Sequence, residues 1–364
     1  MPSSDFLALL APGNIVAVVI VVAMLAYALT GGADFGGGVL DLLATGPRAG
    51  AQRRSIARAI GPIWEANHVW LLVVLVLMFV AFPTAFAAIM TALHLPMLLM
   101  LTGITLRGSA FVFRAYGPDR PEWRRWGLVF GAASAVTPIL LGVVFGAISS
   151  GRITLGLDGA VKTDFVSEWL TPFPWATGLM LQSLFAFLAA TYLTVEEDDP
   201  EVRNDFRRMA VRASYAFFGT ALLAAIMART GAPHLWATLA GSYQAWAMQA
   251  VLAGVAIGAI VALEKDRFQL ARVLAGAQVT LVVLGWAASQ AGWILVGQIP
   301  LAGSAAPDGI LIPVILALVA GLALLIPTFV LLFWLFHRPS RSVAARMERT
   351  PSIPLQAEVA PPVR

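Results

Sequence analysis

The sequence contains no cysteine, only four histidines and few charged residues. Without cysteine, the chain cannot form a disulfide, a thiolate metal site, an iron–sulfur cluster or a covalent c-type haem attachment. No two histidines have the spacing of a metal-binding pair, and we find no nucleotide-binding loop or nucleophilic catalytic motif. Charged residues make up 12% of the chain, and no basic patch is interleaved with aromatic residues, so nucleic acid is not a partner.

What the sequence has in abundance is apolar residues in long runs. Hydrophobic residues make up 59% of the 364 residues, and the mean hydropathy is +0.82. Runs of about 20 apolar residues span a membrane as helices, and these runs are too continuous for a membrane β-barrel. We therefore predict an all-α integral membrane protein. The predicted spans are nine transmembrane helices at 13–33, 63–82, 85–107, 127–149, 172–194, 207–228, 246–263, 270–292 and 310–336.

The positions of the basic residues predict the orientation. Of the 24 Lys and Arg residues, only Arg152, Lys162 and Arg229 fall in the loops on one side. The other 21 lie after predicted helices one, three, five, seven and nine. Because cytoplasmic loops are enriched in Lys and Arg, the amino terminus is predicted to be periplasmic and the carboxyl terminus cytoplasmic. Residues 1–338 are predicted to form a single transmembrane domain, and the proline-rich segment 339–364 is predicted to be a disordered cytoplasmic tail.

Polar residues open the second predicted helix, in the stretch Ile60–Leu71 (IGPIWEANHVWL). Pro83 ends this helix, so its 20 or so residues must begin near Ile63, which draws Glu65 into the hydrocarbon layer. An ionisable group at that depth is expected to face protein or water. His68 lies three residues beyond Glu65, so the two side chains share one side of the helix.

Two interpretations of this stretch remain open. In the simpler one, Glu65 reaches outward to pair with Arg58, while Trp64 and Trp70 are interfacial aromatics. In the other, Glu65 with His68 handles protons, because burial disfavours the carboxylate and moves its titration toward neutral pH. Trp64, Asn67 and His68 occupy one helical stripe in either case.

The second polar motif is TGGADFGGGVLD, at Thr30–Asp41. Gly32 and Gly36 are four residues apart, and Gly37 extends this small surface, so another helix can approach the backbone closely. Helix packing explains these glycines but not Asp34, which we expect to meet Glu65 in one polar entrance. His94 is predicted inside the third helix, where an interhelical hydrogen bond is favoured over haem ligation.

These motifs together resemble subunit II of the cytochrome bd quinol oxidases. The resemblance rests on TGGADFGGG in the first helix, GPIWEANHVWL in the second, GVVFG at 142–146, TPF at 171–173 and ATYL at 190–193. Their order and spacing, and the predicted nine helices, fit the family from the first helix to the last. The motif of the second helix is the most specific of them.

The resemblance implies a heterodimer in the bacterial inner membrane that oxidises quinol and reduces oxygen to water. It implies two four-helix bundles plus one peripheral helix, with haem b and haem d bound chiefly by subunit I and none by this chain alone. Subunit II is then expected to stabilise subunit I and to help deliver cytoplasmic protons. A small accessory subunit is an additional candidate partner, as are membrane lipid and quinone.

The sequence departs from the family pattern at two acidic positions. Gly31 stands where the family usually has an aspartate, and Glu65 replaces another aspartate with a longer acid. The expected proton path therefore depends on Glu65, Asp34 and His68, and the chain contributes no metal ligands. Two alternatives come from other functional classes: an ion-coupled secondary transporter, for which we find no inverted repeat, and a purely structural membrane subunit.

Overall fold

The computed structural model describes residues 11–60, 64–115 and 122–336. Within these ranges, the side chains of residues 64–66, 115, 122–124, 325–326, 329–330 and 332–336 are not described. The predicted tail at 339–364 lies outside the described residues. The chain divides into one compact unit that ends at Leu311 and a second that begins at Ile312.

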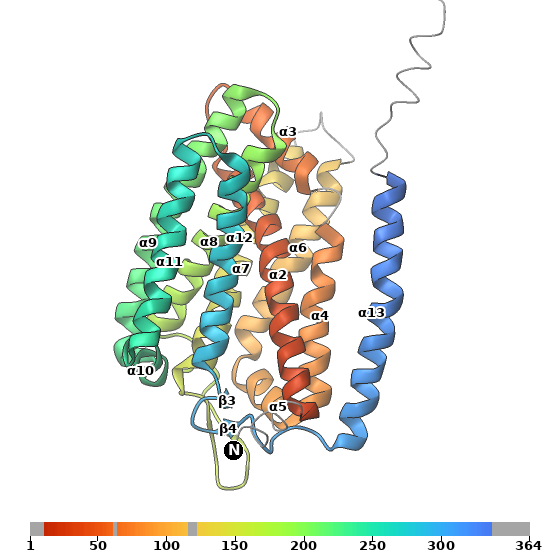
Figure 1. Ribbon diagram of the computed structural model, residues 1–364, viewed down its shortest axis with the longest axis vertical. Coiled ribbons are helices and arrows are strands. Elements are labelled where there is room, and N and C mark those ends of the chain that lie inside the picture. Colours follow the sequence, from red (N-terminus) through yellow and green to blue (C-terminus); the bar gives the residue numbers. More distant parts are fainter. Residues whose placement is uncertain (1–10, 61–63, 116–121, 337–364) are drawn as a thin grey trace, which may run out of the picture. The chain divides into compact units, whose positions relative to one another are not determined.

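The structure is built almost entirely of helices (Figure 1). The helices are α2 (Pro12–Leu43), α3 (Ala49–Ile60), α4 (Trp64–Ala81), α5 (Pro83–Ala92), α6 (His94–Ala115), α7 (Glu122–Ser150), α8 (Pro172–Glu196), α9 (Pro200–Gly231), α10 (Pro233–Ala240), α11 (Tyr243–Glu264), α12 (Phe268–Ser289) and α13 (Asp308–Phe336). Two short antiparallel hairpins connect them, β1 (Thr154–Leu155) with β2 (Val161–Lys162), and β3 (Trp293–Leu295) with β4 (Ile299–Pro300).

Seven of the described helices are long and apolar enough to cross a membrane, and there are eight if the bent pair α4 and α5 counts as one span. Helix α13, which lies mostly in the second unit, adds a shorter apolar stretch at Asp308–Leu324. The all-helical membrane fold is therefore confirmed. The count of nine spans, their grouping into two bundles and the orientation of the termini remain predictions.

The predicted third span, a single helix at 85–107, is wrong because the structure divides this stretch between two helices. Helix α5 bends by 119° from α4 and ends at Ala92, and α6 then begins at His94 and continues to Ala115. Pro83 causes the first break, as predicted, because it occupies the first turn of α5. The backbone N–H of Ala306 donates to the carbonyl of Ala81 at 2.8 Å, which stabilises the end of α4 at the bend.

The core of the first unit forms where α2 and α8 cross, with α4, α7, α9 and α12 packed around them. Small residues permit this approach, since a Cβ atom on Gly36 would lie 2.0 Å from the carbonyl oxygen of Phe185. Gly142 and Gly178 bring α7 and α8 together in the same way, because a Cβ on Gly142 would lie 2.6 Å from the Cα of Gly178. The predicted role of the glycines in helix packing is supported by these contacts.

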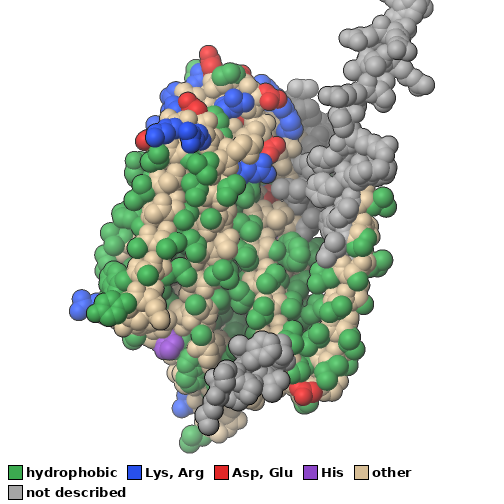
Figure 2. Space-filling view, in the orientation of Figure 1, with side chains coloured by type: hydrophobic (Ala, Val, Ile, Leu, Met, Phe, Trp, Pro, Cys, Tyr) green, Lys and Arg blue, Asp and Glu red, His purple; other side chains and the backbone are tan. Residues whose placement is uncertain are grey.

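Charged side chains gather at one end of the first unit, here called the arginine-rich end, where α2 and α8 end and α3 and α9 begin (Figure 2). Below them the surface over α9, α11 and α12 is mainly hydrophobic, with Phe218 65% and Val273 67% exposed. Such a surface suits contact with lipid chains. Arg48, Arg203, Arg207 and Arg272 all lie at the arginine-rich end and pair with acids or carbonyls there.

We predict that Gly36→Ala destabilises the protein strongly. The new methyl group would meet backbone that has no side-chain freedom to move, and forcing α2 away from α8 would expose packed surface along both helices. We expect a loss of about 2 kcal/mol or more in unfolding free energy. Thermal unfolding of the purified protein in detergent would measure it.

Gly254→Ala is the matched control. Gly254 lies in α11 with nothing within 4 Å of an added Cβ, so alanine should be neutral or stabilise the helix by up to about 1 kcal/mol. Equal melting temperatures for the two variants would contradict the close-packing argument.

Candidate functional site

The glycine-rich half of α2 carries two buried acids that pair with two arginines of α6. Arg107 Nη2 lies 2.5 Å from Asp34 Oδ1, and both side chains are almost completely buried. One heptad further along both helices, Arg114 makes two hydrogen bonds to Asp41, at 3.0 and 3.1 Å. Residues seven apart return to the same face of a helix, so the two salt bridges connect the same faces of α2 and α6, one heptad apart.

The surroundings of Arg107 satisfy its charge in several ways. Its Nε donates to Ser134 Oγ at 2.9 Å, and Nη2 also reaches the Asp34 carbonyl at 3.3 Å. The rings of Phe35 and Phe130 lie 4.8 and 5.0 Å from the guanidinium carbon, within cation–π range. A charged group 1% exposed thus has an acid, a hydroxyl and two aromatic faces as neighbours.

Polar residues of α4 approach the same region of α2. The imidazole of His68 makes edge contacts with Tyr27 and Phe35, with ring centroids 6.3 and 6.1 Å apart. Phe35 therefore lies between His68 and Arg107. Asn67 is 2% exposed, and among the described residues neither its Nδ2 nor Asp34 Oδ2 has a hydrogen-bond partner. Buried polar atoms without a protein partner commonly hydrogen-bond to ordered water, and such water can also pass protons.

Phe35, the residue after Asp34, contacts both His68 and Arg107, so Asp34 and His68 belong to the same part of the α2–α4 contact. The expected meeting of Asp34 with Glu65 stays a prediction. Glu65 and Trp64 belong to the first turn of α4, but their side chains lie outside the described residues. Trp70 is partly buried against the core rather than fully at an interface. Arg58 is exposed on α3.

The other motif glycines serve packing. A Cβ on Gly32 would meet the Phe185 ring at 2.7 Å, and one on Gly37 would meet Ile60 Cδ1 at 2.7 Å.

At the arginine-rich end, polar contacts attach α3 to α2 and α9. Arg48 makes two hydrogen bonds of 2.7 Å to Asp205, and Gln52 Nε2 donates to the same carboxylate at 2.9 Å. Arg53 Nη2 donates to the carbonyl of Ala44 at 2.9 Å, just beyond the end of α2. The hydroxyl of Ser55 donates to Glu197.

The contacts around Glu197 change the pKa of its carboxyl group. Burial would raise the pKa of its carboxyl, but hydrogen bonds from Ser55 and from backbone N–H groups outweigh burial and lower the pKa.

Arg107, Arg114 and Ser134 were missed by sequence reasoning. Arg107 and Arg114 were counted with the loop after the third helix, but they lie inside α6 and are largely buried. The signal was available in their spacing of seven, which equals the spacing of Asp34 and Asp41. Ser134 had no such signal, because it is one of several small polar residues in an apolar helix.

The prediction for His94 is also wrong. His94 is the first residue of α6, is exposed, and its Nδ1 contacts the carbonyl of Thr91 at 3.0 Å in the turn just before it. Its ring meets Phe165 edge-on, with centroids 4.9 Å apart. His94 therefore makes a local contact at a helix start, and not a hydrogen bond inside the bundle. Within the part of the chain that the structure describes, no group of three His, Cys, Asp or Glu side chains could hold a metal ion.

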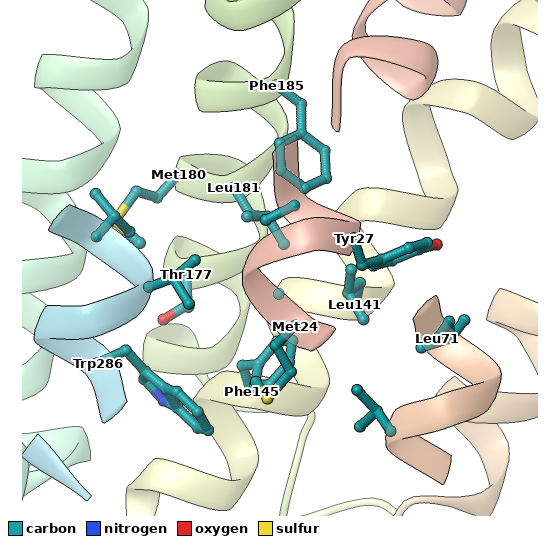
Figure 3. Close-up of a pocket in the computed structure, with 15 residues that line it drawn as sticks. Met24, Tyr27, Leu71, Leu141, Phe145, Thr177, Met180, Leu181, Phe185 and Trp286 are labelled. Atoms are coloured by element: carbon teal, nitrogen blue, oxygen red, sulfur yellow. The ribbon is translucent and has the colours of Figure 1, made fainter. Parts of the chain in front are cut away.

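An apolar cavity lies beside the polar region, toward the opposite end of the bundle (Figure 3). Two adjoining chambers of about 100 and about 240 Å³ share Met24, Leu71, Leu141, Phe145 and Trp286. Phe185 lies at one end of the smaller chamber, and Trp286 and Phe145 lie at the other (Figure 3). Tyr27 lines this chamber and also contacts His68, so apolar and polar regions meet at one side chain.

Comparison with known proteins identifies the family. Residues 12–336 match the sequence model described as Cytochrome bd terminal oxidase subunit II. The chain belongs to this family. The match covers every described helix, including both polar regions of α2 and α4, and it confirms the resemblance carried by the motifs.

Individual relatives agree with this assignment. The Cytochrome bd-I ubiquinol oxidase subunit 2 of Escherichia coli (strain K12) is 29% identical over 178 residues, or 47% of this chain and 45% of that protein. The Cytochrome bd ubiquinol oxidase subunit 2 of Bacillus subtilis (strain 168) is 29% identical over 160 residues, or 44% of this chain and 46% of that protein. The chain thus spans about half the length of the curated relatives it matches.

A solved structure shares the fold. A chain in the structure of bd oxidase from Geobacillus thermodenitrificans has a TM-score of 0.75 and 21% sequence identity, and the match covers 90% of this chain and 98% of that one. Membrane helices and family membership place the protein in the bacterial inner membrane.

We predict that either Asp34→Asn or Arg107→Gln alone costs about 3–5 kcal/mol of stability, because each leaves a buried charge without its partner. The double variant should cost clearly less than the sum of the two single variants. Thermal unfolding of the four proteins would complete the cycle.

The exposed pair Arg272 and Glu196 supplies the control, since its partners are 41% and 55% exposed and should contribute no more than about 1 kcal/mol. Single variants at Asp34 and Arg107 that cost no more than this surface pair would show that the buried salt bridge is unimportant for stability.

Proposed function

We propose that this chain is subunit II of a cytochrome bd-type terminal oxidase, which oxidises quinol and reduces oxygen to water. The observation that carries the proposal is the family match over residues 12–336. The relatives from Escherichia coli and Bacillus subtilis, both named as ubiquinol oxidase subunits, agree with it. In this proposal the chain stabilises a haem-bearing subunit I and helps deliver protons.

Haem b and haem d belong, in this proposal, to subunit I. When bound, these groups carry electrons from quinol and reduce oxygen. Among the described residues, His94 is exposed and engaged with the Thr91 carbonyl at a helix start, so it does not fit the role of a buried axial haem ligand. In this proposal the chain's own contribution is confined to packing and to proton supply.

The proton path is proposed to pass Glu65, Asp34 and His68 at the α2–α4 contact. Asp34 is held by Arg107 through one carboxylate oxygen, so a proton arriving there must share or break a salt bridge. Glu65 and His68 are therefore the better proton carriers in this proposal, and the Asp34–Arg107 pair is a neutral ion pair beside Phe35, which also contacts His68. Among the described residues, Asp34 Oδ2 and Asn67 Nδ2 have no hydrogen-bond partner, which supports this interpretation because both atoms offer places for water.

The proposed orientation puts the arginine-rich end in the cytoplasm, where the protons for oxygen reduction are taken up. It rests on the distribution of Lys and Arg along the sequence. A reporter that fluoresces only in the cytoplasm, fused to the carboxyl terminus, should give signal. If the fusion protein is correctly inserted but does not fluoresce, the proposed orientation is wrong.

The test of the overall function is the purified complex. It should contain a second subunit, show haem b and haem d absorption bands, and consume oxygen when supplied with quinol. A lone, haem-free chain would instead favour a secondary transporter.

We predict that Glu65→Gln, in an assembled and fully haem-loaded complex, lowers the rate of oxygen consumption by about 10-fold or more. The loss should be greatest at high pH, where protons are scarce. Glu65→Asp should keep part of the activity, because it keeps the acid with a shorter reach. Oxygen uptake measured against pH, with the haem spectrum as a check on assembly, would show both effects.

Asp198→Asn is the control, because Asp198 is an exposed acid at the same end of the bundle. It should match the wild type at every pH. If Glu65→Gln also matches the wild type, Glu65 is structural and the proton path must be sought elsewhere.

A further inference from the structure

A pocket of about 440 Å³ opens at the arginine-rich end, between the start of α9 and the turn that joins α11 to α12. It belongs neither to the α2–α4 polar region nor to the apolar cavity. Its lining consists of Pro200, Arg203, Asn204, Arg207, Asp266 and Phe268.

Arg203 is fixed in this pocket by contacts that leave much of its guanidinium available. Its Nε and Nη2 donate to the carbonyl of Glu197 at 2.8 and 2.5 Å, and Phe268 lies 5.9 Å from the guanidinium carbon. Since arginine has five N–H donors, three remain without a protein partner among the described residues. The first turn of α9 is itself anchored, because Asp199 accepts from the backbone N–H groups of Glu201 and Val202.

Arg207 lines the pocket one helical turn beyond Arg203. Its Nη1 donates to Asp266 Oδ1 at 3.0 Å, which leaves four donors. Two arginines and one aspartate give the pocket a net charge of about +1. Around it, exposed Lys265 and Arg267 flank Asp266, and the exposed acids Glu264 and Glu201 lie next to the same two segments.

The pocket lies at the start of α9 and the turn between α11 and α12, at the charged end of these helices. Figure 2 shows a mainly hydrophobic surface below the charged end. Along these helices, Tyr215 is 60%, Phe218 65% and Ile257 61% exposed, as expected of side chains that face lipid. Basic pockets at the ends of membrane helices suit the head groups of anionic lipids.

We propose that this pocket binds the phosphate of an anionic phospholipid with a glycerol head group, and that its acyl chains lie on the apolar surface of α9 and α11. Arg203 and Arg207 donate to the phosphate oxygens, since guanidinium groups match phosphate geometry. Asp266 and Asn204 offer acceptors for the head-group hydroxyls. The pocket's charge of about +1 balances the single negative charge of a phosphodiester. The site is independent of the proton path, and only the assignment to the cytoplasmic leaflet rests on the proposed orientation.

The experiment is native mass spectrometry of the purified complex, titrated with phosphatidylglycerol or with phosphatidylcholine of the same acyl chains. The wild type should bind the first phosphatidylglycerol more tightly than phosphatidylcholine. The Arg203→Gln/Arg207→Gln variant should weaken phosphatidylglycerol binding about 20-fold and leave phosphatidylcholine unchanged. The matched control, Arg54→Gln/Arg125→Gln, removes two exposed arginines outside the pocket and should change binding by less than about twofold.

Because Arg203 also holds a backbone carbonyl, Arg207→Gln is measured alone. It should weaken phosphatidylglycerol binding about 5-fold, and Arg207→Lys should restore most of it. Equal binding of the two lipids by the wild type, or equal loss in the control variant, would overturn the proposal. Full displacement of phosphatidylglycerol by millimolar inorganic phosphate would also overturn it, because the pocket would then be a site for soluble anions.

Discussion

The salt bridge between Asp34 and Arg107 fixes how the first helices can be arranged. Two charges this deeply buried require each other, because neither has water to solvate it. Their pairing sets the rotation of α2 relative to α6, and the second pair, Arg114 with Asp41, repeats the same register one heptad along. Successive helical residues differ by about 100°, so Gly36, two positions after Asp34, must face away from α6. That direction is where α8 lies in backbone contact.

The polar and apolar parts of the interior lie toward opposite ends of the helices. Asp34, Arg107 and His68 lie on the side toward the arginine-rich end, and the chambers lined by Met24, Leu141 and Trp286 lie on the other. Tyr27 stands between them, with its ring against His68. The first group offers polar partners for water, whereas the lining of the chambers is mainly apolar.

The predictions succeeded where the signal was local. Apolar length predicted the membrane helices, and Pro83 predicted the break after α4 because proline cannot continue a helix. They failed where distant residues decide the outcome. Helix α2 continues to Leu43 through five glycines because packing outweighs their weak helix propensity, with Gly32 and Gly36 against α8, Gly37 against α3 and Gly38 against α7.

The candidate site was predicted in part for the same reason. The motif identified Asp34 and His68, which the structure places around Phe35, but the cation that pairs with Asp34 comes from another helix. Arg107 was counted with a loop because the sequence does not show which helices are neighbours. Its pairing with Asp34 depends on the position of α2 beside α6. His94 was placed inside a longer helix because Pro96, which lies in the first turn of α6 and marks its start, was not used as a signal. The role of Glu65 stays a prediction.

The same salt bridge constrains how the chain is made. Asp34 and Arg107 are separated by 73 residues, so at about 5–20 residues per second the acid is synthesised about 4–15 s before the base. During that interval α2 carries an unneutralised acid together with the glycines that will later contact α8. The apolar part of α2 is long enough to span the bilayer by itself, so the acid near its end is the part that depends on α6. The final rotation of α2 is thus fixed only after its countercharge has been synthesised.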